Sequence, residues 1–166
     1  DFNVLVVEDN RDDIFFLRDI VTKLDSAEFP GRCNFVYLGS LESAVQYVVS
    51  QDVHLVLLDL FLPDSRGLKT LEVIRESAPQ VPVIILTALD DKTTSVEAVK
   101  MGAQEYLVKS QLDENLLLKS IHYAVERQQL QLQLEKETMD LQQRENQLMR
   151  IINNDPDGLI IVDTGS

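Results

Sequence analysis

Residues 53–63 form a short apolar run that ends in a single carboxylate and a turn. The run is VHLVLLDLFLP, with Asp59 near its end and Pro63 closing it. It is too short to cross a membrane, and its nearly continuous hydrophobicity is typical of a strand buried on both faces of a parallel sheet. Ligands bind at the carboxyl ends of such strands. Asp59 is therefore a candidate nucleophile, a candidate metal ligand or both, unless it only caps a turn.

Four further segments have the composition of strands, and they alternate with segments of helical spacing. Strands are expected at 3–7, 34–38, 83–86 and 105–108, and helices at 12–24, 41–49, 68–77 and 90–101. Asp12 and Asp13 are expected to cap and charge the first helix. Alternation of this kind predicts βαβ units with right-handed crossovers. We predict an α/β fold with a doubly wound five-stranded parallel sheet in the flavodoxin-like order 2-1-3-4-5, and a long C-terminal helix.

Chemically active side chains follow four of the predicted strands: Glu8 and Asp9, Asp59, Thr87 and Lys109. In the predicted order these strands are neighbours, so the side chains should converge at one sheet edge. Two carboxylates about 4 Å apart repel by about 4 kcal/mol at an effective dielectric of about 20. Mg²⁺ relieves such repulsion, whereas a lysine and a hydroxyl hold an anion. The set predicts a site where a phosphoryl group is placed on Asp59 with Mg²⁺.

These residues lie in motifs that resemble the receiver domain of bacterial two-component response regulators. The motifs are VVEDN at 6–10, LLDLFLPD at 57–64 with Gly67, LTA at 86–88, and GA at 102–103 leading to YLVK at 106–109. The resemblance covers residues 1–126 and involves separated motifs in the family's order. It implies a phosphorelay protein that takes its phosphoryl group from a histidine kinase or a phosphotransfer protein. It also implies no enzymatic turnover beyond use of the phosphodonor.

The resemblance assigns roles residue by residue. Asp59 would be the phosphoacceptor, and Lys109 would contact the phosphoryl group. Thr87 and Tyr106 would form a switch pair, in which Thr87 moves toward the phosphoryl group and Tyr106 turns inward. Asp9, Asp59 and the backbone carbonyl of Phe61 would bind Mg²⁺, and Glu8 would help to hold it through a water.

Two features of the motifs have consequences of their own. Receivers usually follow the lysine with proline, often through a cis peptide, but here Ser110 follows Lys109. A cis bond without proline costs about 3–4 kcal/mol, so this bond is either trans or held under strain. Phe61 and Leu89 follow Asp59 and Thr87 by two residues and cannot orient an attacking water. We therefore expect a long-lived phosphoryl group.

The C-terminal part of the sequence predicts one long helix, because neither glycine nor proline occurs between Gly102 and Pro156. Leu134, Leu141 and Leu148 recur every seven residues, as at the d positions of a coiled coil. We expect residues 127–152 to be a helical linker that forms a parallel homodimer, the alternative being a solvated lone helix. Residues 153–166 resemble the opening of a PAS sensory domain, which implies that the natural protein continues.

Charge and composition argue against several classes of partner. A formal net charge of −13 disfavours nucleic acids and anionic membrane surfaces. The single cysteine, Cys33, cannot form an internal disulfide, and no apolar run approaches a membrane span. We expect a cytoplasmic protein with neither a nucleic-acid nor a membrane partner.

Three other functions compete with the receiver. A haloacid dehalogenase-type phosphatase needs a second aspartate two residues after the first, where this chain has Phe61. A flavodoxin-like FMN binder would have its phosphate repelled by Glu8 and Asp9. A receiver-fold scaffold that works without phosphorylation and dimerises through its helix remains the alternative function.

Overall fold

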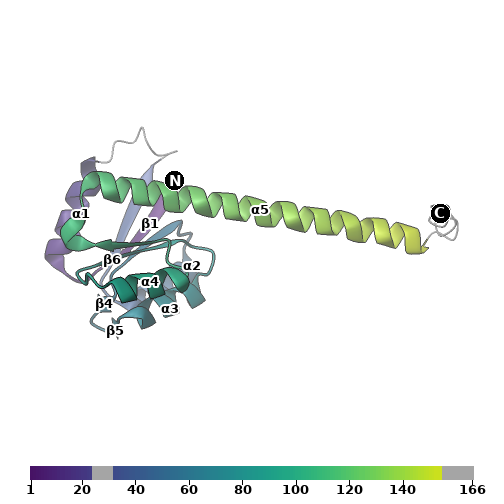
Figure 1. Ribbon diagram of the computed structural model, residues 1–166. Helices are drawn as coiled ribbons and strands as arrows, with labels where there is room; N and C mark the ends of the chain where they lie inside the picture. The colour runs from purple at the N-terminus through teal and green to yellow at the C-terminus, as the bar shows by residue number, and fades with distance from the viewer. Residues whose placement is uncertain (24–31, 155–166) are drawn as a thin grey trace. The chain divides into compact units, whose positions relative to one another are not determined.

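A five-stranded parallel sheet forms the core of the computed structural model, which describes residues 1–23 and 32–154 (Figure 1). Its strands are β1 (Phe2–Val7), β2 (Cys33–Leu38), β3 (Leu55–Leu58), β6 (Val83–Thr87) and β7 (Glu105–Val108). They lie in the order β2-β1-β3-β6-β7, and every neighbouring pair is parallel. The predicted fold class and strand order are confirmed.

Helices cover both faces of this sheet. They are α1 (Arg11–Lys23), α2 (Leu41–Ser50), α3 (Leu68–Ser77), α4 (Lys92–Lys100) and α5 (Glu114–Asn154), with a short 3-10 helix, η1 (Lys109–Gln111), before α5. Alternate residues of β3 pack against the helices on opposite faces of the sheet. Leu55 and Leu57 pack in a cluster with residues of α1 and α5, whereas Val56 and Leu58 pack with residues of α2, α3 and α4. Burial on both faces explains the continuous apolar run in the sequence.

A small antiparallel hairpin follows Asp59 where the sequence predicted only a turn. Its strands, β4 (Phe61–Leu62) and β5 (Ser65–Arg66), are two residues each, too short to give a periodic pattern. Gly67 then turns the chain into α3 with a φ of 68°, a value that glycine adopts without a steric penalty. Its N–H donates to the Leu60 carbonyl at 2.7 Å, which fixes the loop beside Asp59.

Asp64, at the tip of this hairpin, ties the loop to the start of α2. Its carboxylate accepts hydrogen bonds from the backbone N–H groups of Leu41 at 2.8 Å and Glu42 at 2.9 Å. The bonds from Glu42 and Leu41 lower the pKa of Asp64. The Ser40 side chain caps the same helix by accepting from the Ser43 N–H.

Replacing Asp64 with alanine should lower the free energy of unfolding by about 1 kcal/mol at pH 7, as for other lost helix caps. Because the folded-state pKa lies below the unfolded one, this contribution is present above the unfolded pKa. It is lost as the pH falls through the folded pKa. Urea unfolding of both proteins at pH 7 and at pH 3 measures the difference. Asp64→Asn is the matched control, since its neutral oxygen should retain part of the effect, and a pH-independent difference would contradict the capping role.

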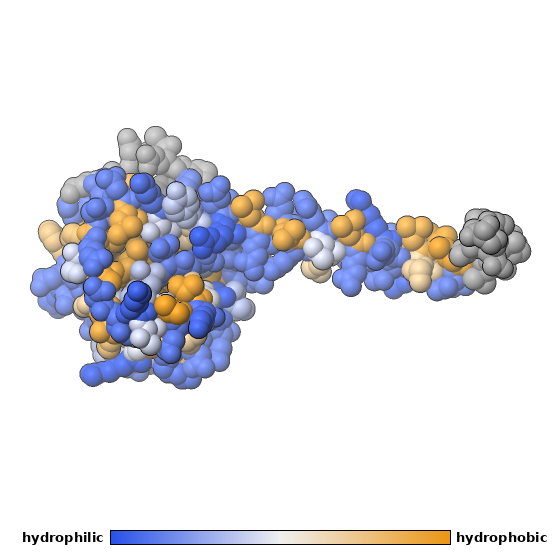
Figure 2. Space-filling model, viewed as in Figure 1, coloured by the Kyte–Doolittle hydropathy of each residue, from blue (hydrophilic) through white to orange (hydrophobic). Residues whose placement is uncertain are grey.

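The long C-terminal helix is confirmed. Contacts divide the chain into two units, residues 1–128 and residues 129–166, and α5 contributes to both. The buried residues of α5 all lie in its first part, namely Leu117, Ser120, Ile121 and Ala124. In the second unit, side chains between 129 and 154 are exposed except for half-buried Ile152, and apolar ones recur among hydrophilic ones (Figure 2).

Two predictions fall on parts of the chain that the structure does not describe. Leu24, the last residue of the first predicted helix, is one, and residues 155–166 of the PAS-like segment are the other. Among the helices of the described residues, none combines the length and the apolar character needed to cross a membrane.

Candidate functional site

Three carboxylates meet at the carboxyl edge of the sheet. Glu8 and Asp9 follow β1, and Asp59 follows β3; the Asp59 N–H donates to the Val7 carbonyl at 3.0 Å, which brings the two strand ends together. Carboxylate oxygens of Glu8, Asp9 and Asp59 all lie within 4.8 Å of one another. Glu8 is 2% exposed and Asp59 6%, whereas Asp9 is exposed. This is an acidic cluster with one side open to water.

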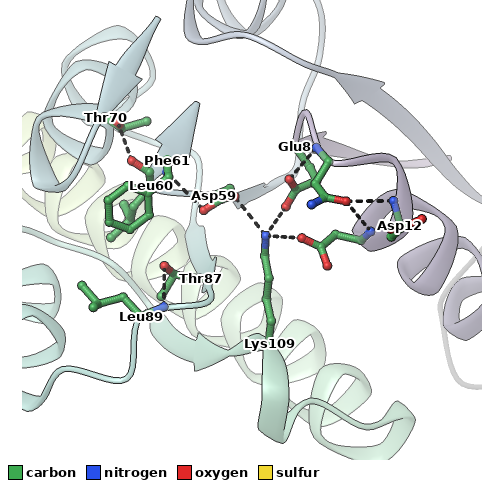
Figure 3. Close-up of polar contacts among 11 residues, drawn as sticks. Glu8, Asp12, Asp59, Leu60, Phe61, Thr70, Thr87, Leu89 and Lys109 are labelled. Atoms are coloured by element: carbon green, nitrogen blue, oxygen red, sulfur yellow. Dashed lines mark hydrogen bonds and ion pairs between the residues drawn. The ribbon is translucent and has the colours of Figure 1, made fainter. Parts of the chain in front are cut away.

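Lys109 reaches the cluster from the end of β7, across β6 (Figure 3). Its Nζ lies 2.6 Å from Glu8 Oε2, 2.9 Å from Asp59 Oδ2 and 2.7 Å from Asp13 Oδ2. Burial alone would lower the pKa of Lys109, but the hydrogen bonds to Asp13, Glu8 and Asp59 outweigh it and raise the pKa well above its ordinary value. Lys109 is therefore a fixed positive charge that cannot act as a base.

The two buried carboxylates are held by different partners. Burial raises the pKa of Glu8, against the effects of its hydrogen bonds from Lys109 and from the Asn10 N–H at 2.9 Å. Asp59 Oδ2 accepts from Lys109, while its Oδ1 accepts from the Phe61 N–H at 3.1 Å. Both oxygens of Asp59 thus have fixed directions. The carboxylate is presented at the edge of the sheet and can react with an electrophile that arrives there.

Within the described part of the chain, neither Thr87 nor Tyr106 forms a hydrogen bond with Asp59, but both bind the backbone of Leu89. The Leu89 N–H donates to the Thr87 hydroxyl oxygen at 3.2 Å, and the Tyr106 hydroxyl donates to the Leu89 carbonyl at 2.8 Å. Thr87 is fully buried and Tyr106 half-buried. Figure 3 shows the Thr87 hydroxyl directed to Leu89 rather than to Lys109. The loop after β6 therefore connects these two side chains.

Asp13 is a site residue that the sequence analysis missed. It was predicted only to cap and charge the first helix, and the capping part is wrong. The cap is the Asn10 side chain, which accepts from the N–H groups of Asp12 at 2.9 Å and Asp13 at 3.3 Å. The signal was nevertheless present, because α1 starts four residues after β1 ends, so its first turn lies at the same sheet edge.

Ser110, which follows Lys109 where receivers usually have proline, is joined to it by an ordinary peptide bond. The described residues contain no cis peptide bond, so the Lys109–Ser110 bond is trans and the unstrained alternative is correct. Lys109 and Ser110 instead open η1, the single 3-10 turn that leads toward α5.

The family model of the response regulator receiver domain matches residues 4–122. The chain belongs to this family. A receiver domain is a signalling module rather than a classical enzyme. The acidic cluster, Asp59 and Lys109 lie within the matched residues, and the fold around them is that of known receivers.

Individual relatives support the same family. The regulatory protein LuxO of Vibrio cholerae is 33% identical over 104 residues, which are 63% of this chain and 21% of LuxO. The solved signal receiver domain of a putative Luxo repressor protein from Vibrio parahaemolyticus has a TM-score of 0.68 and 25% identity, covering 80% of this chain and 96% of that one. The Mn²⁺-bound form of response regulator Rcp1 shares the fold, with a TM-score of 0.59 at 22% identity, covering 72% of this chain and 89% of that one.

The receiver accounts for only a part of such regulators. This chain spans about a fifth of the length of LuxO, and of the response regulator FleR of Pseudomonas aeruginosa, which is 35% identical over 106 residues, 64% of this chain and 21% of FleR.

Proposed function

We propose that this receiver accepts a phosphoryl group on Asp59 from a phosphohistidine donor, a histidine kinase or a phosphotransfer protein. The observation that carries the proposal is the Lys109 ammonium, 2.9 Å from Asp59 Oδ2, within a cluster of carboxylates open to water on one side. An Asp59 oxygen attacks phosphorus, the phosphorus–nitrogen bond of the donor breaks, and the imidazole leaves with the electron pair and is protonated. Lys109 offsets the charge that accumulates on the phosphoryl oxygens.

The donor set fits Mg²⁺. Carboxylate oxygens that gather within 4.8 Å of one another are the hard ligands that Mg²⁺ prefers. Asp9, Asp59, Glu8 and the Phe61 carbonyl would hold the ion, which would neutralise charge on the phosphoryl oxygens when bound. The similar regulator Rcp1 was solved with Mn²⁺, an ion of related coordination chemistry.

We further propose that Thr87 and Tyr106 transmit the phosphorylated state through Leu89. When the Thr87 hydroxyl turns toward a phosphoryl oxygen, it gives up its hydrogen bond with the Leu89 N–H. The loop is then free to shift, and Tyr106, whose hydroxyl binds the Leu89 carbonyl, can turn inward. Phosphorylation acts in this way by shifting a two-state equilibrium.

Acetyl phosphate is the donor that tests the acceptor directly. Intact mass should show a gain of one phosphoryl group that requires Mg²⁺ and is removed by hydroxylamine, as for an acyl phosphate. After removal of the donor, the group should persist for minutes or longer, because half-exposed Phe61 and Leu89 are apolar and offer no group to orient water. A lifetime of seconds would contradict the predicted persistence. No gain at all, with the fold intact, would favour the phosphorylation-independent scaffold.

The second part of α5 fits a parallel homodimer with a second copy of the chain. Leu134, Leu141 and Leu148 are 59–65% exposed on a helix that has little other support, and an isolated helix of this kind is marginal in water. With these leucines at d positions, Arg144 falls at g and Glu145 at a. In a parallel pair, the a side chain packs beside the preceding g residue of the other helix. Arg144 of one copy would therefore neutralise Glu145 of the second.

A charge swap tests this arrangement. Arg144→Glu or Glu145→Arg alone should weaken the dimer about tenfold (~1.4 kcal/mol) because like charges then meet along the seam. The double variant should restore wild-type affinity, since the opposite charges are exchanged rather than lost. Among the described residues neither side chain forms an ion pair within the chain, so the substitutions break no intramolecular ion pair that would also change the measured affinity. Sedimentation equilibrium measures the association, and a monomeric wild type would overturn the dimer.

A further inference from the structure

Asp13 occupies one of the three N–H donors of Lys109. Its Oδ2 lies 2.7 Å from Nζ, and Glu8 and Asp59 take the other two donors at 2.6 and 2.9 Å. An ammonium has three donors and no more, so Lys109 is fully occupied before a phosphoryl group arrives. A phosphoryl oxygen can bind Lys109 only if one of the three carboxylates gives up its hydrogen bond.

We propose that Asp13 is a positioning residue that competes with the phosphoryl group for Lys109 and so restrains phosphorylation of Asp59. The proposal rests on the proposed function and adds a regulator to that site. Asp13 holds Lys109 within the carboxylate cluster in the unphosphorylated protein. It must release the ammonium before Lys109 can bind the phosphoryl group fully.

Of the three carboxylates, Asp13 can give up its hydrogen bond to Lys109 at the smallest cost in free energy. Glu8 is 2% exposed and would be left buried with its charge uncompensated. Asp59 carries the phosphoryl group itself. The Asp13 side chain is 33% exposed, so the released carboxylate can be hydrated. The N-terminal turn of α1 also favours a negative charge on Asp13 after its release.

The charge balance of the site points the same way. Glu8, Asp13 and Asp59 share one ammonium, Asp9 lies close to Glu8 and Asp59, and the phosphoryl group brings further negative charge. Asp13 therefore opposes the transfer twice, by repelling the donor and by holding the cation that would stabilise it. Repulsion of the donor is a general effect of negative charge. Holding the ammonium requires contact with Lys109, so a variant without that contact can separate the two effects.

Asp12 provides a matched control. It lies in the same turn of α1, carries the same charge and is exposed, but its carboxylate does not contact Lys109 in the described structure. Asp13→Asn should raise the initial rate of acetyl phosphate labelling about tenfold (~1.4 kcal/mol) at saturating Mg²⁺, read by intact mass. Asp12→Asn should leave the rate near that of wild type. An equal gain in both variants would reduce the effect to net charge and overturn the proposal.

A double-mutant cycle distinguishes a positioning role of Asp13, which acts through Lys109, from a purely structural role. In a Lys109→Ala background, Asp13→Asn should give no advantage over Asp12→Asn, because the contact that Asp13 controls is gone. An advantage that persists without Lys109, or an Asp13→Asn protein that is slower than or equal to wild type, would overturn the positioning role. If wild type takes up no phosphoryl group, the proposed function and this inference fail together. Wild-type uptake without an Asp13 effect removes only the inference.

Discussion

Replacing Asp59 with asparagine is expected to abolish phosphoryl uptake. An amide oxygen cannot form a stable acyl phosphate, although the side chain keeps its size. Its one oxygen can replace Oδ1 and accept from the Phe61 N–H, whereas the bond that Oδ2 accepts from Lys109 is lost. The variant also removes one of several carboxylates that repel one another, so the fold should be retained. Intact mass after incubation with acetyl phosphate and Mg²⁺ measures the loss, and circular dichroism measures the fold.

The control for this prediction is an aspartate outside the cluster. Asp52 is a suitable choice, because its side chain is 87% exposed and lies 3.7 Å from His54, at the opposite end of β3 from Asp59. Asp52→Asn should take up one phosphoryl group like wild type. A hydroxylamine-labile gain in Asp59→Asn at the wild-type rate would place the acceptor on another carboxylate and contradict the assignment of Asp59.

The sequence predicted those parts of the site that depend on strand order alone. Glu8, Asp9, Asp59 and Lys109 each follow a strand directly, and parallel strands bring their carboxyl ends to one edge. No side-chain conformation is needed for that inference. The continuous apolar runs of β3 and β6 were equally informative, because both strands are buried on both faces.

Other features depend on where side chains point, which the sequence pattern does not determine. Asp13 has an adequate local explanation as a charge at a helix start, so nothing in the pattern required it to reach Lys109. The link between Thr87 and Tyr106 runs through backbone atoms of Leu89, which no motif describes. The hairpin after Asp59 was missed because strands of two residues carry no periodicity.

Removing the Lys109 side chain is expected to have the second large effect, on stability and on switching. Lys109→Ala leaves the buried carboxylates of Glu8 and Asp59 without their cation. Breaking a buried pair in this way costs about 3–5 kcal/mol, and because water reaches this site we expect about 2–3 kcal/mol. Urea unfolding in EDTA measures the loss. Adding Mg²⁺ should recover part of it, because an ion that binds only the folded state stabilises that state.

Lys69 provides the control for stability, because it pairs with Glu72 on an exposed surface where water screens the charges. Lys69→Ala should leave the unfolding midpoint almost unchanged. For switching, hydrogen exchange at the Leu89 amide is the direct measurement, since this N–H donates to Thr87. Phosphorylation should speed this exchange in wild type but not in Lys109→Ala, because Thr87 needs a phosphoryl group held in a fixed position. If the variant responds like wild type, Lys109 has no part in the switch and its role is limited to charge compensation.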